Sequence, residues 1–253
     1  MLKKSLPDIT LLAISSVFIP ETIQALQKCC EDIEFKETIL ISHELPQNLP
    51  NNIKFEKCNK INNIDDFNSF CFYDLYKYFN TSHCLSVQYH ATVLNAYVWE
   101  DSWLQYDWIG APWKYSDNAY ITKTGKHIRQ GNGGFTLKSR KILELPTKYD
   151  LPMKSEQGWK NEDGQFCVYW EPLFTDLGIK YAPVEVAAKF AYENDVPENI
   201  GVKPFGFHRY LPNKGKIFSQ EHRKKLSDAA KKRYNEDSGG DYETRYLFCC
   251  EQV

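Results

Sequence analysis

The segment ITLLAISSV, residues 9–17, is short, apolar and rich in β-forming residues at its end. This pattern predicts a buried strand. Pro20 follows and is expected to open a helix, because proline is well tolerated in the first helical turn. Four apolar positions then recur at helical spacing and define the buried face of that helix: Ile23, Leu26, Cys30 and Ile33.

Outward from this unit, the pattern of strand, helix and strand continues. Thr38–Ser42 (TILIS), Ile53–Lys57 (IKFEK) and Cys84–Gln88 (CLSVQ) are predicted strands. Between the last two, Asp65 or Asp66 is expected to cap a second amphipathic helix. This alternation predicts an α/β fold with a mostly parallel sheet, flanked by helices, over the first ~90 residues.

The topology indicates where ligands bind. In open parallel sheets the binding crevice lies outside the carboxyl ends of the strands. Functional residues are therefore expected just after Val17, Ser42 and Gln88. Beyond the sheet-forming half, Asp163–Leu177 looks helical and Pro204–Tyr210 looks like loop.

Composition excludes several classes of protein. The chain has 253 residues, of which 42% are hydrophobic and 25% charged, which is typical of a soluble globular protein and not of a collagen, coiled coil or disordered chain. The net charge of −2 argues against a generic nucleic-acid binder. Aromatic residues reach 15%, and such side chains fill cores and also line pockets for sugars and bases.

Cysteine usage and hydropathy bear on the compartment. The eight cysteines include no pair at the two-residue spacing of a zinc or redox motif, so a reduced, cytoplasmic setting is expected. The apolar run of residues 9–19 has the length of a signal peptide, but Pro7 and Asp8 interrupt its approach and no small-residue cleavage site follows. No run approaches the ~18 apolar residues of a membrane span.

The composition changes near residue 212. Ser219–Tyr234 (SQEHRKKLSDAAKKRY) reads as a basic helix on the surface. We therefore expect one α/β domain over residues 1–212 and a basic helical extension over residues 213–253.

Several short segments carry candidate functional groups. His90 follows the strand that ends at Gln88 and is either a metal or phosphate contact or a histidine bonded to a neighbour. Gly131–Phe135 (GNGGF) lets backbone approach a ligand, or forms a tight turn. Glu162 and Asp163 supply a general base and a hydrogen-bond anchor, or only oppose a helix dipole. His208, in PFGFH, is a metal ligand or a structural histidine.

Five motifs occur in a fixed order and together resemble a known family. They are YDWIGAPW (106–113), GNGGFTLKSRK (131–141), NEDGQF (161–166), YAPVEVAAKFAYE (181–193) and PFGFH (204–208). The chain resembles, over about residues 70–212, a bacterial and viral domain family of unknown specificity that is similar to GT-A-fold glycosyltransferases.

The resemblance implies roles for particular residues. Asp163 and Glu162 would be catalytic and meet the acceptor, and His90 and His208 would complete a site for Mn²⁺ or another divalent cation. The substrate-binding residues would be Gln88, Trp113, Asn132, Gly133, Gly134 and Phe135. Trp108 is a further aromatic candidate for stacking on a sugar or base ring.

One position departs from the family pattern, which has aspartate where this chain has His90. An imidazole brings no negative charge, but Mn²⁺ and later metals accept nitrogen better than Mg²⁺ does. Three outcomes remain open: a Mn²⁺ site, a metal-free site in which Lys138, Arg140 or Arg129 binds the phosphates, and an inactive domain.

The resemblance thus implies transfer of a sugar from a nucleotide-sugar donor to a glycan or other hydroxyl acceptor, in glycan or polysaccharide synthesis. The alternative is a catalytically degenerate protein of the same fold that binds glycan. A second resemblance, of residues 215–234 to a DNA-binding helix attached to nucleases, makes DNA an alternative partner through the tail.

Overall fold

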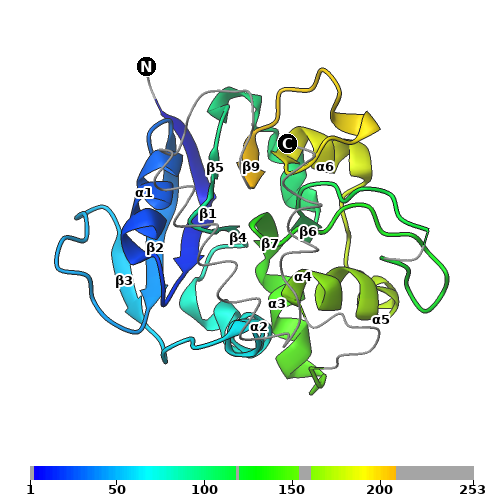
Figure 1. Ribbon diagram of the computed structural model, residues 1–253, viewed down its shortest axis with the longest axis horizontal. Coiled ribbons are helices and arrows are strands. Elements are labelled where there is room, and N and C mark those ends of the chain that lie inside the picture. Colours follow the sequence, from blue (N-terminus) through cyan, green and yellow to red (C-terminus); the bar gives the residue numbers. More distant parts are fainter. Residues whose placement is uncertain (1–2, 118–119, 154–160, 209–253) are drawn as a thin grey trace, which may run out of the picture. The chain divides into compact units, whose positions relative to one another are not determined.

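A computed structural model describes residues 3–117, 120–153 and 161–208, and its centre is a six-stranded sheet (Figure 1). The strands lie in the order β3-β2-β1-β4-β7-β6. Their bounds are β1 Lys4–Ile14, β2 Ile33–Ser42, β3 Lys54–Lys57, β4 His83–Val87, β6 Trp108–Ile109 and β7 Phe135–Ser139. The first four strands pair in parallel, and β7 and β6 are antiparallel additions. The expected α/β fold with a mostly parallel sheet is confirmed.

Helices cover both faces of this sheet, because successive strand residues point to opposite sides. On β1, Leu11 packs in one apolar cluster and Leu12 in the other. Helices α1 and α6 contribute to the first cluster, and α2, α3 and α5 to the second. The helix bounds are α1 Ile19–Cys29, α2 Ile64–Tyr73, α3 Arg140–Lys148, α4 Glu162–Gly164, α5 Glu171–Asp176 and α6 Val184–Phe190.

A second, three-stranded sheet has the order β5-β9-β8. Its strands are β5 Ala91–Val93, β8 Ala191–Tyr192 and β9 Gly206–His208. The expectation of loop over Pro204–Tyr210 is therefore wrong for β9, which is too short for a sequence pattern to register. Pairing of Ala91 with His208 brings the end of the described chain beside the segment that follows β4.

Local details also differ from expectation. Ile33 begins β2 and so does not belong to the first helix. The cap of α2 is Asn63, whose side-chain oxygen accepts a hydrogen bond from the Asp66 backbone N–H at 2.8 Å, so neither aspartate caps it. The segment Asp163–Leu177 is helical as expected, but it is divided into α4, a short π-helix over Gln165–Tyr169 and α5.

The remaining expectations concern cysteines, the membrane and the tail. All six cysteines in the described ranges are free thiols. Within those ranges, every helix is too short or too polar to cross a membrane. The boundary near residue 212 and the basic extension over residues 213–253 lie outside the described residues and stay predictions.

Candidate active site

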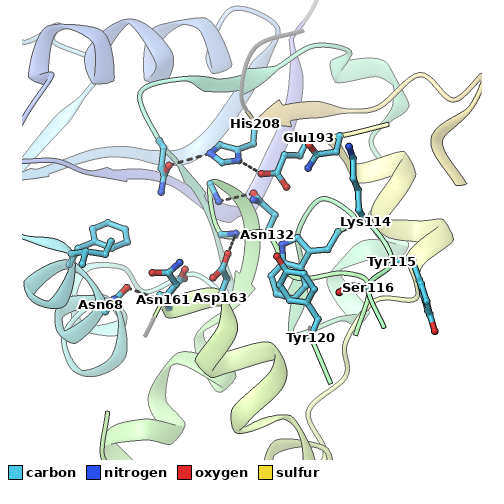
Figure 2. A pocket seen from close by; sticks show the side chains of 18 residues that line it. Asn68, Lys114, Tyr115, Ser116, Tyr120, Asn132, Asn161, Asp163, Glu193 and His208 are labelled. Carbon is cyan, nitrogen blue, oxygen red and sulfur yellow. Dashed lines mark hydrogen bonds and ion pairs between the residues drawn. The ribbon is translucent and has the colours of Figure 1, made fainter. Parts of the chain in front are cut away.

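A pocket of about 490 Å³ lies where β4 ends and β7 begins (Figure 2). The two segments are joined there by a hydrogen bond from the Gln88 backbone N–H to the carbonyl oxygen of Gly134, at 2.9 Å. The site therefore lies at the carboxyl end of a parallel strand, as the topology predicts. Of the three expected positions only the one at Gln88 contributes, because no residue just after Val17 or Ser42 is among the described lining residues. Its lining is rich in amide, carboxylate and aromatic side chains: Ile64, Phe67, Asn68, Gln88, Trp113, Lys114, Tyr115, Ser116, Tyr120, Asn132, Gly133, Gly134, Asn161, Glu162, Asp163, Glu193, Asn194 and His208.

Asp163 is a half-buried carboxylate in the first turn of α4. Its Oδ1 accepts a hydrogen bond from the Gly164 N–H at 2.8 Å, and its Oδ2 accepts one from the Gly133 N–H at 3.3 Å. Burial, reinforced by the negative charge of Glu162, raises the pKa of Asp163 to about 7. These effects outweigh the two N–H donors, which act in the opposite direction. A carboxyl with such a pKa can exchange protons near neutral pH.

Glu162, the neighbouring acid, is held in a different way. Its carboxylate is paired with the ammonium group of Lys138, which comes from β7 and is only 1% exposed. Burial by itself lowers the pKa of Lys138, but the charge of Glu162 and the nearby thiols hold it above its ordinary value. The Glu162 backbone N–H also donates to Asn68 Oδ1 at 3.0 Å. The acid pair is therefore asymmetric, with one member neutralised by a buried cation.

His90 and His208 are brought together by the pairing of β5 with β9. Their Nε2 atoms lie 2.7 Å apart, and the His208 Nε2 also lies 3.3 Å from Gln88 Oε1. On the other side of the His208 ring, Nδ1 lies 3.4 Å from the Glu193 carboxylate. A carboxylate on the far nitrogen is a common way to orient a histidine that ligates a metal. Across the described ranges, no group of three or more His, Cys, Asp or Glu is arranged to hold a metal ion.

The glycines of GNGGF serve close packing of side chains. Neither Gly133 nor Gly134 has a positive φ. A methyl group on Gly133 would overlap the Glu162 carboxylate, and one on Gly134 would overlap the His208 ring. Asn132 fixes the turn, because its Oδ1 accepts a hydrogen bond from the Gly134 N–H at 2.9 Å. The turn therefore brings the acid pair and the histidine to the same pocket.

An aromatic wall is supplied by the excursion between β6 and β7. Trp113 and Tyr120 stack with ring centroids 4.1 Å apart and planes inclined by 20°. Backbone pairing of Pro112 with Gln130 closes the base of this excursion. Figure 2 shows Tyr120, Lys114 and Ser116 at one side of the pocket in this view, and Asn161 and Asp163 at the other.

Most of the residues expected from the sequence therefore meet at one pocket. Gln88, Trp113, Asn132, Gly133, Gly134, Glu162, Asp163 and His208 all line it. His90 reaches it through the hydrogen bond to His208.

Two aromatic candidates lie elsewhere. Phe135 is fully buried and packs against Phe190 and Phe205, on the face of β7 that points into the core. The structure does not bring it to the pocket. Trp108 is likewise buried and stacks on Phe166, with centroids 5.3 Å apart.

The basic residues considered for a metal-free site are all engaged in the protein. Lys138 is paired with Glu162. Arg129 binds both carboxylate oxygens of Glu198, at 3.0 and 2.9 Å. Arg140 donates to the carbonyl oxygens of Tyr76 and Phe79. Lys114 is the one lysine or arginine among the described pocket residues.

Sequence reasoning missed several lining residues, among them Asn68, Lys114, Tyr120 and Glu193. Glu193 could have been found, because it ends the motif YAPVEVAAKFAYE. Asn68 gave a weaker signal, as a polar position in a largely apolar helix. Tyr120 gave none, because its place in the pocket depends on how the excursion folds back.

Comparison with solved structures returned proteins that are distantly similar. A crystal structure of an active-site mutant of LgtC has 13% identity and a TM-score of 0.48, covering 87% of this chain and 95% of its own. The apo-form glycosyltransferase GlyE of Streptococcus pneumoniae has 12% identity and a TM-score of 0.43, with 90% and 60% covered. TarS of S. aureus has 14% identity and a TM-score of 0.36, with 63% and 53% covered.

No curated protein matches the chain in sequence. The family described as "Protein of unknown function (DUF5672)" matches residues 50–208, which contain all five motifs and every described pocket residue. The match does not reach residues 215–234, and no comparison supports the resemblance of that segment to a DNA-binding helix. Since more than half of its residues fit this one pattern, the chain belongs to the DUF5672 family.

Proposed function

We propose that the protein transfers a sugar from a nucleotide-sugar donor to a hydroxyl group of an acceptor, in the synthesis of a glycan or polysaccharide. The observation that carries the proposal is Asp163, a carboxyl with a pKa of about 7 in a pocket at the carboxyl end of β4. Such a group can take the proton of an acceptor hydroxyl as the new glycosidic bond forms and the nucleotide leaves with the electrons of the broken bond.

The remainder of the pocket suits a ligand with many hydroxyl groups. Amide side chains can donate and accept hydrogen bonds at once, as sugar hydroxyls do. Five of the described lining residues carry such a group, namely Asn68, Gln88, Asn132, Asn161 and Asn194. The aromatic rings of the excursion offer apolar faces of the kind that sugar rings cover.

The nucleotide's diphosphate needs compensating positive charge, and the pocket supplies little. Lys114 shares the pocket with the acidic residues Glu193 and Asp163, and Lys138 is already paired with Glu162. We therefore propose a divalent cation, Mn²⁺ in preference to Mg²⁺. The hydrogen bond between the Nε2 atoms of His90 and His208 would open, and both imidazoles would hold the ion together with the donor's own phosphates. When bound, the cation would neutralise the charge that develops on the diphosphate as the sugar leaves.

The test is calorimetric titration with UDP and GDP, each with and without Mn²⁺, followed by assays of nucleotide-sugar hydrolysis under the same conditions. We expect one nucleotide to bind in a Mn²⁺-dependent manner and its sugar conjugate to be hydrolysed slowly in water. Nucleotide binding that is equally tight without Mn²⁺ would refute the proposal that a divalent cation takes part. Absence of any nucleotide binding, with or without Mn²⁺, would refute the proposed transferase activity.

A second candidate is a glycan-binding protein without turnover. The observation in its favour is the direct bond between His90 and His208, which satisfies two ring nitrogens without a metal. This candidate predicts that glycans bind in the absence of nucleotide and that no donor is hydrolysed.

A further inference from the structure

The side chains of Arg129 and Glu198 are joined by two hydrogen bonds. The two terminal guanidinium nitrogens of Arg129 donate to the two carboxylate oxygens of Glu198, at 3.0 and 2.9 Å. Each side chain is only 20% exposed, and the bond from Arg129 lowers the pKa of Glu198. Such a bidentate pair fixes the orientation of the guanidinium group as well as attracting it. Glu198 therefore determines where the Arg129 side chain lies.

The other contacts of Arg129 lead to two residues of the pocket. Its Nε donates to the carbonyl oxygen of Trp113 at 3.1 Å, and its carbonyl oxygen accepts a hydrogen bond from the Trp113 N–H at 2.7 Å. Its guanidinium carbon lies 6.0 Å from the ring centroid of Tyr115. Trp113 and Tyr115 are described lining residues, whereas Arg129 and Glu198 are not among them. Any effect of Glu198 on the pocket is thus transmitted through Arg129.

The two partners come from separate segments of the chain. Arg129 belongs to the excursion between β6 and β7, and Glu198 to the short 3₁₀-helix Pro197–Asn199, which precedes β9. A second ion pair, from Lys126 to the buried Glu171 of α5 at 2.5 Å, holds the excursion at another point. Loss of the first pair should therefore loosen one side of the excursion without detaching the whole of it.

The wall that Arg129 supports is separate from the groups assigned to the nucleotide. The histidine pair, where we place the cation and the diphosphate, comes from the segment after β4 and from β9. Tyr115 belongs to the excursion and is 58% exposed, so this wall reaches solvent. Figure 2 shows Tyr115 and Asn68 at opposite edges of the pocket in this view. An acceptor has to enter from solvent while the nucleotide is bound, and a wall that reaches solvent suits that ligand.

We propose that Arg129 and Glu198 are positioning residues for the acceptor, which they serve by holding Trp113 and Tyr115 in place. The inference rests on the proposed function. It gives Arg129 a role other than the phosphate binding considered from the sequence, because Glu198 already occupies its terminal nitrogens. Loss of the pair should weaken the binding of acceptor and leave the binding of nucleotide intact.

The experiment compares wild type with Glu198→Ala, Arg129→Gln, the double variant and the control Glu144→Ala. Glu144 pairs with Arg140 at 2.8 Å within α3 and is not among the described lining residues. Amide hydrogen exchange, followed by NMR without any ligand, reports the opening of the Trp113 N–H, with the amides of β4 as internal reference. Calorimetry measures the affinity for nucleotide with Mn²⁺. Kinetics with a panel of methyl pyranosides as acceptors give KM and kcat.

We expect Glu198→Ala to speed exchange at the Trp113 N–H and to raise the acceptor KM, each by about tenfold. The kcat, the nucleotide affinity and exchange in β4 should not change, and Glu144→Ala should match wild type. The double variant should equal Arg129→Gln, because both residues act through one contact.

Unchanged exchange at Trp113 in Glu198→Ala would overturn the positioning role. A fall in nucleotide affinity that parallels the rise in KM would overturn the assignment to the acceptor. Failure of the proposed function is recognised separately. If wild type binds no nucleotide, the transferase is refuted, and faster exchange at Trp113 in Glu198→Ala would still establish that the pair holds this wall of the pocket.

Discussion

Asp163 combines two features that are seldom found in one carboxyl group, namely backbone N–H donors and a raised pKa. The donors from Gly133 and Gly164 favour the charged form, and burial beside Glu162 disfavours it more strongly. The result is a group that carries its proton up to about pH 7. An aspartate that served only to cap a helix would gain from a low pKa. This contrast favours a chemical role for Asp163 over a structural one.

Replacement of Asp163 by asparagine should therefore separate activity from stability. We expect wild-type transfer to rise with pH up to about 7, as Asp163 loses its proton. Asp163→Asn should lower the rate by on the order of 10²-fold or more, the usual worth of a general base.

The stability of Asp163→Asn should change in the opposite sense. The unfolded chain releases this proton near pH 4 and the native protein near pH 7, so wild type loses stability between these values as pH rises. Asp163→Asn lacks this loss and should be more stable than wild type by about 1 kcal/mol or more at pH 8, in urea unfolding. The same change at the exposed Asp176 serves as control. The stability of Asp163→Asn is compared with that of wild type at pH 5 and at pH 8. If this difference favoured the variant less at pH 8 than at pH 5, the raised pKa of Asp163 would be contradicted.

At the scale of elements, the pair of Lys138 and Glu162 joins β7 to α4. Both side chains are almost fully buried, so the loss of one partner leaves an uncompensated charge in the interior. We expect Glu162→Gln to lower the free energy of unfolding by about 3–5 kcal/mol. The double variant Lys138→Met/Glu162→Gln removes both charges and should recover most of that loss. Denaturant titration measures all three.

A surface pair provides the matched control. Lys28 and Glu31 form an ion pair with both side chains about half exposed, so Glu31→Gln should cost under about 1 kcal/mol. The double variant also tests the role of Glu162. If it retains transfer, Glu162 is a positioning residue that holds Asp163 and the glycine turn. If it folds but has lost transfer, Glu162 takes part in catalysis as the sequence resemblance implies.

The elements that the sequence predicted well are those whose patterns are local. β1, β2 and β4 are evident as apolar runs, because a strand that is buried on both faces needs a continuous hydrophobic stretch. The helices between them are evident from apolar residues at helical spacing. β9 was not evident, since its three residues pair with β5 and β8 from distant parts of the chain. The position of His208 depends on that pairing. Its approach to His90 could be inferred from family resemblance but not from any periodicity.

The glycine turn illustrates a partial success. Its composition correctly indicated close approach, but the approaching groups are the side chains of Glu162 and His208. A glycine-rich composition indicates that other groups approach the backbone closely, but it does not identify those groups. The same limit applies to Phe135, which follows the glycines in sequence. Strand alternation directs it away from Lys138 and into the core.

At the scale of the whole molecule, the described residues end at β9, and the expected domain boundary lies only a few residues later. A chain that ends after residue 212 keeps β9, Phe205 and His208. We expect it to unfold cooperatively with the stability of the full chain and to bind nucleotide with the same affinity. A chain that ends after residue 203 lacks β9 and the fully buried Phe205, so β5 and β8 lose their shared partner.

We expect this shorter chain to lose several kcal/mol of stability, the usual cost of deleting a buried aromatic and its strand pairing, and with it nucleotide binding. Thermal unfolding and calorimetry of the two truncated chains and the full chain measure these differences. A retention assay on duplex DNA extends the comparison to the basic segment. DNA retention by the full chain that is absent from the chain ending at 212 would establish a role for residues 213–253. If the chain ending at 212 is itself unfolded, the one-domain assignment of residues 1–212 is wrong.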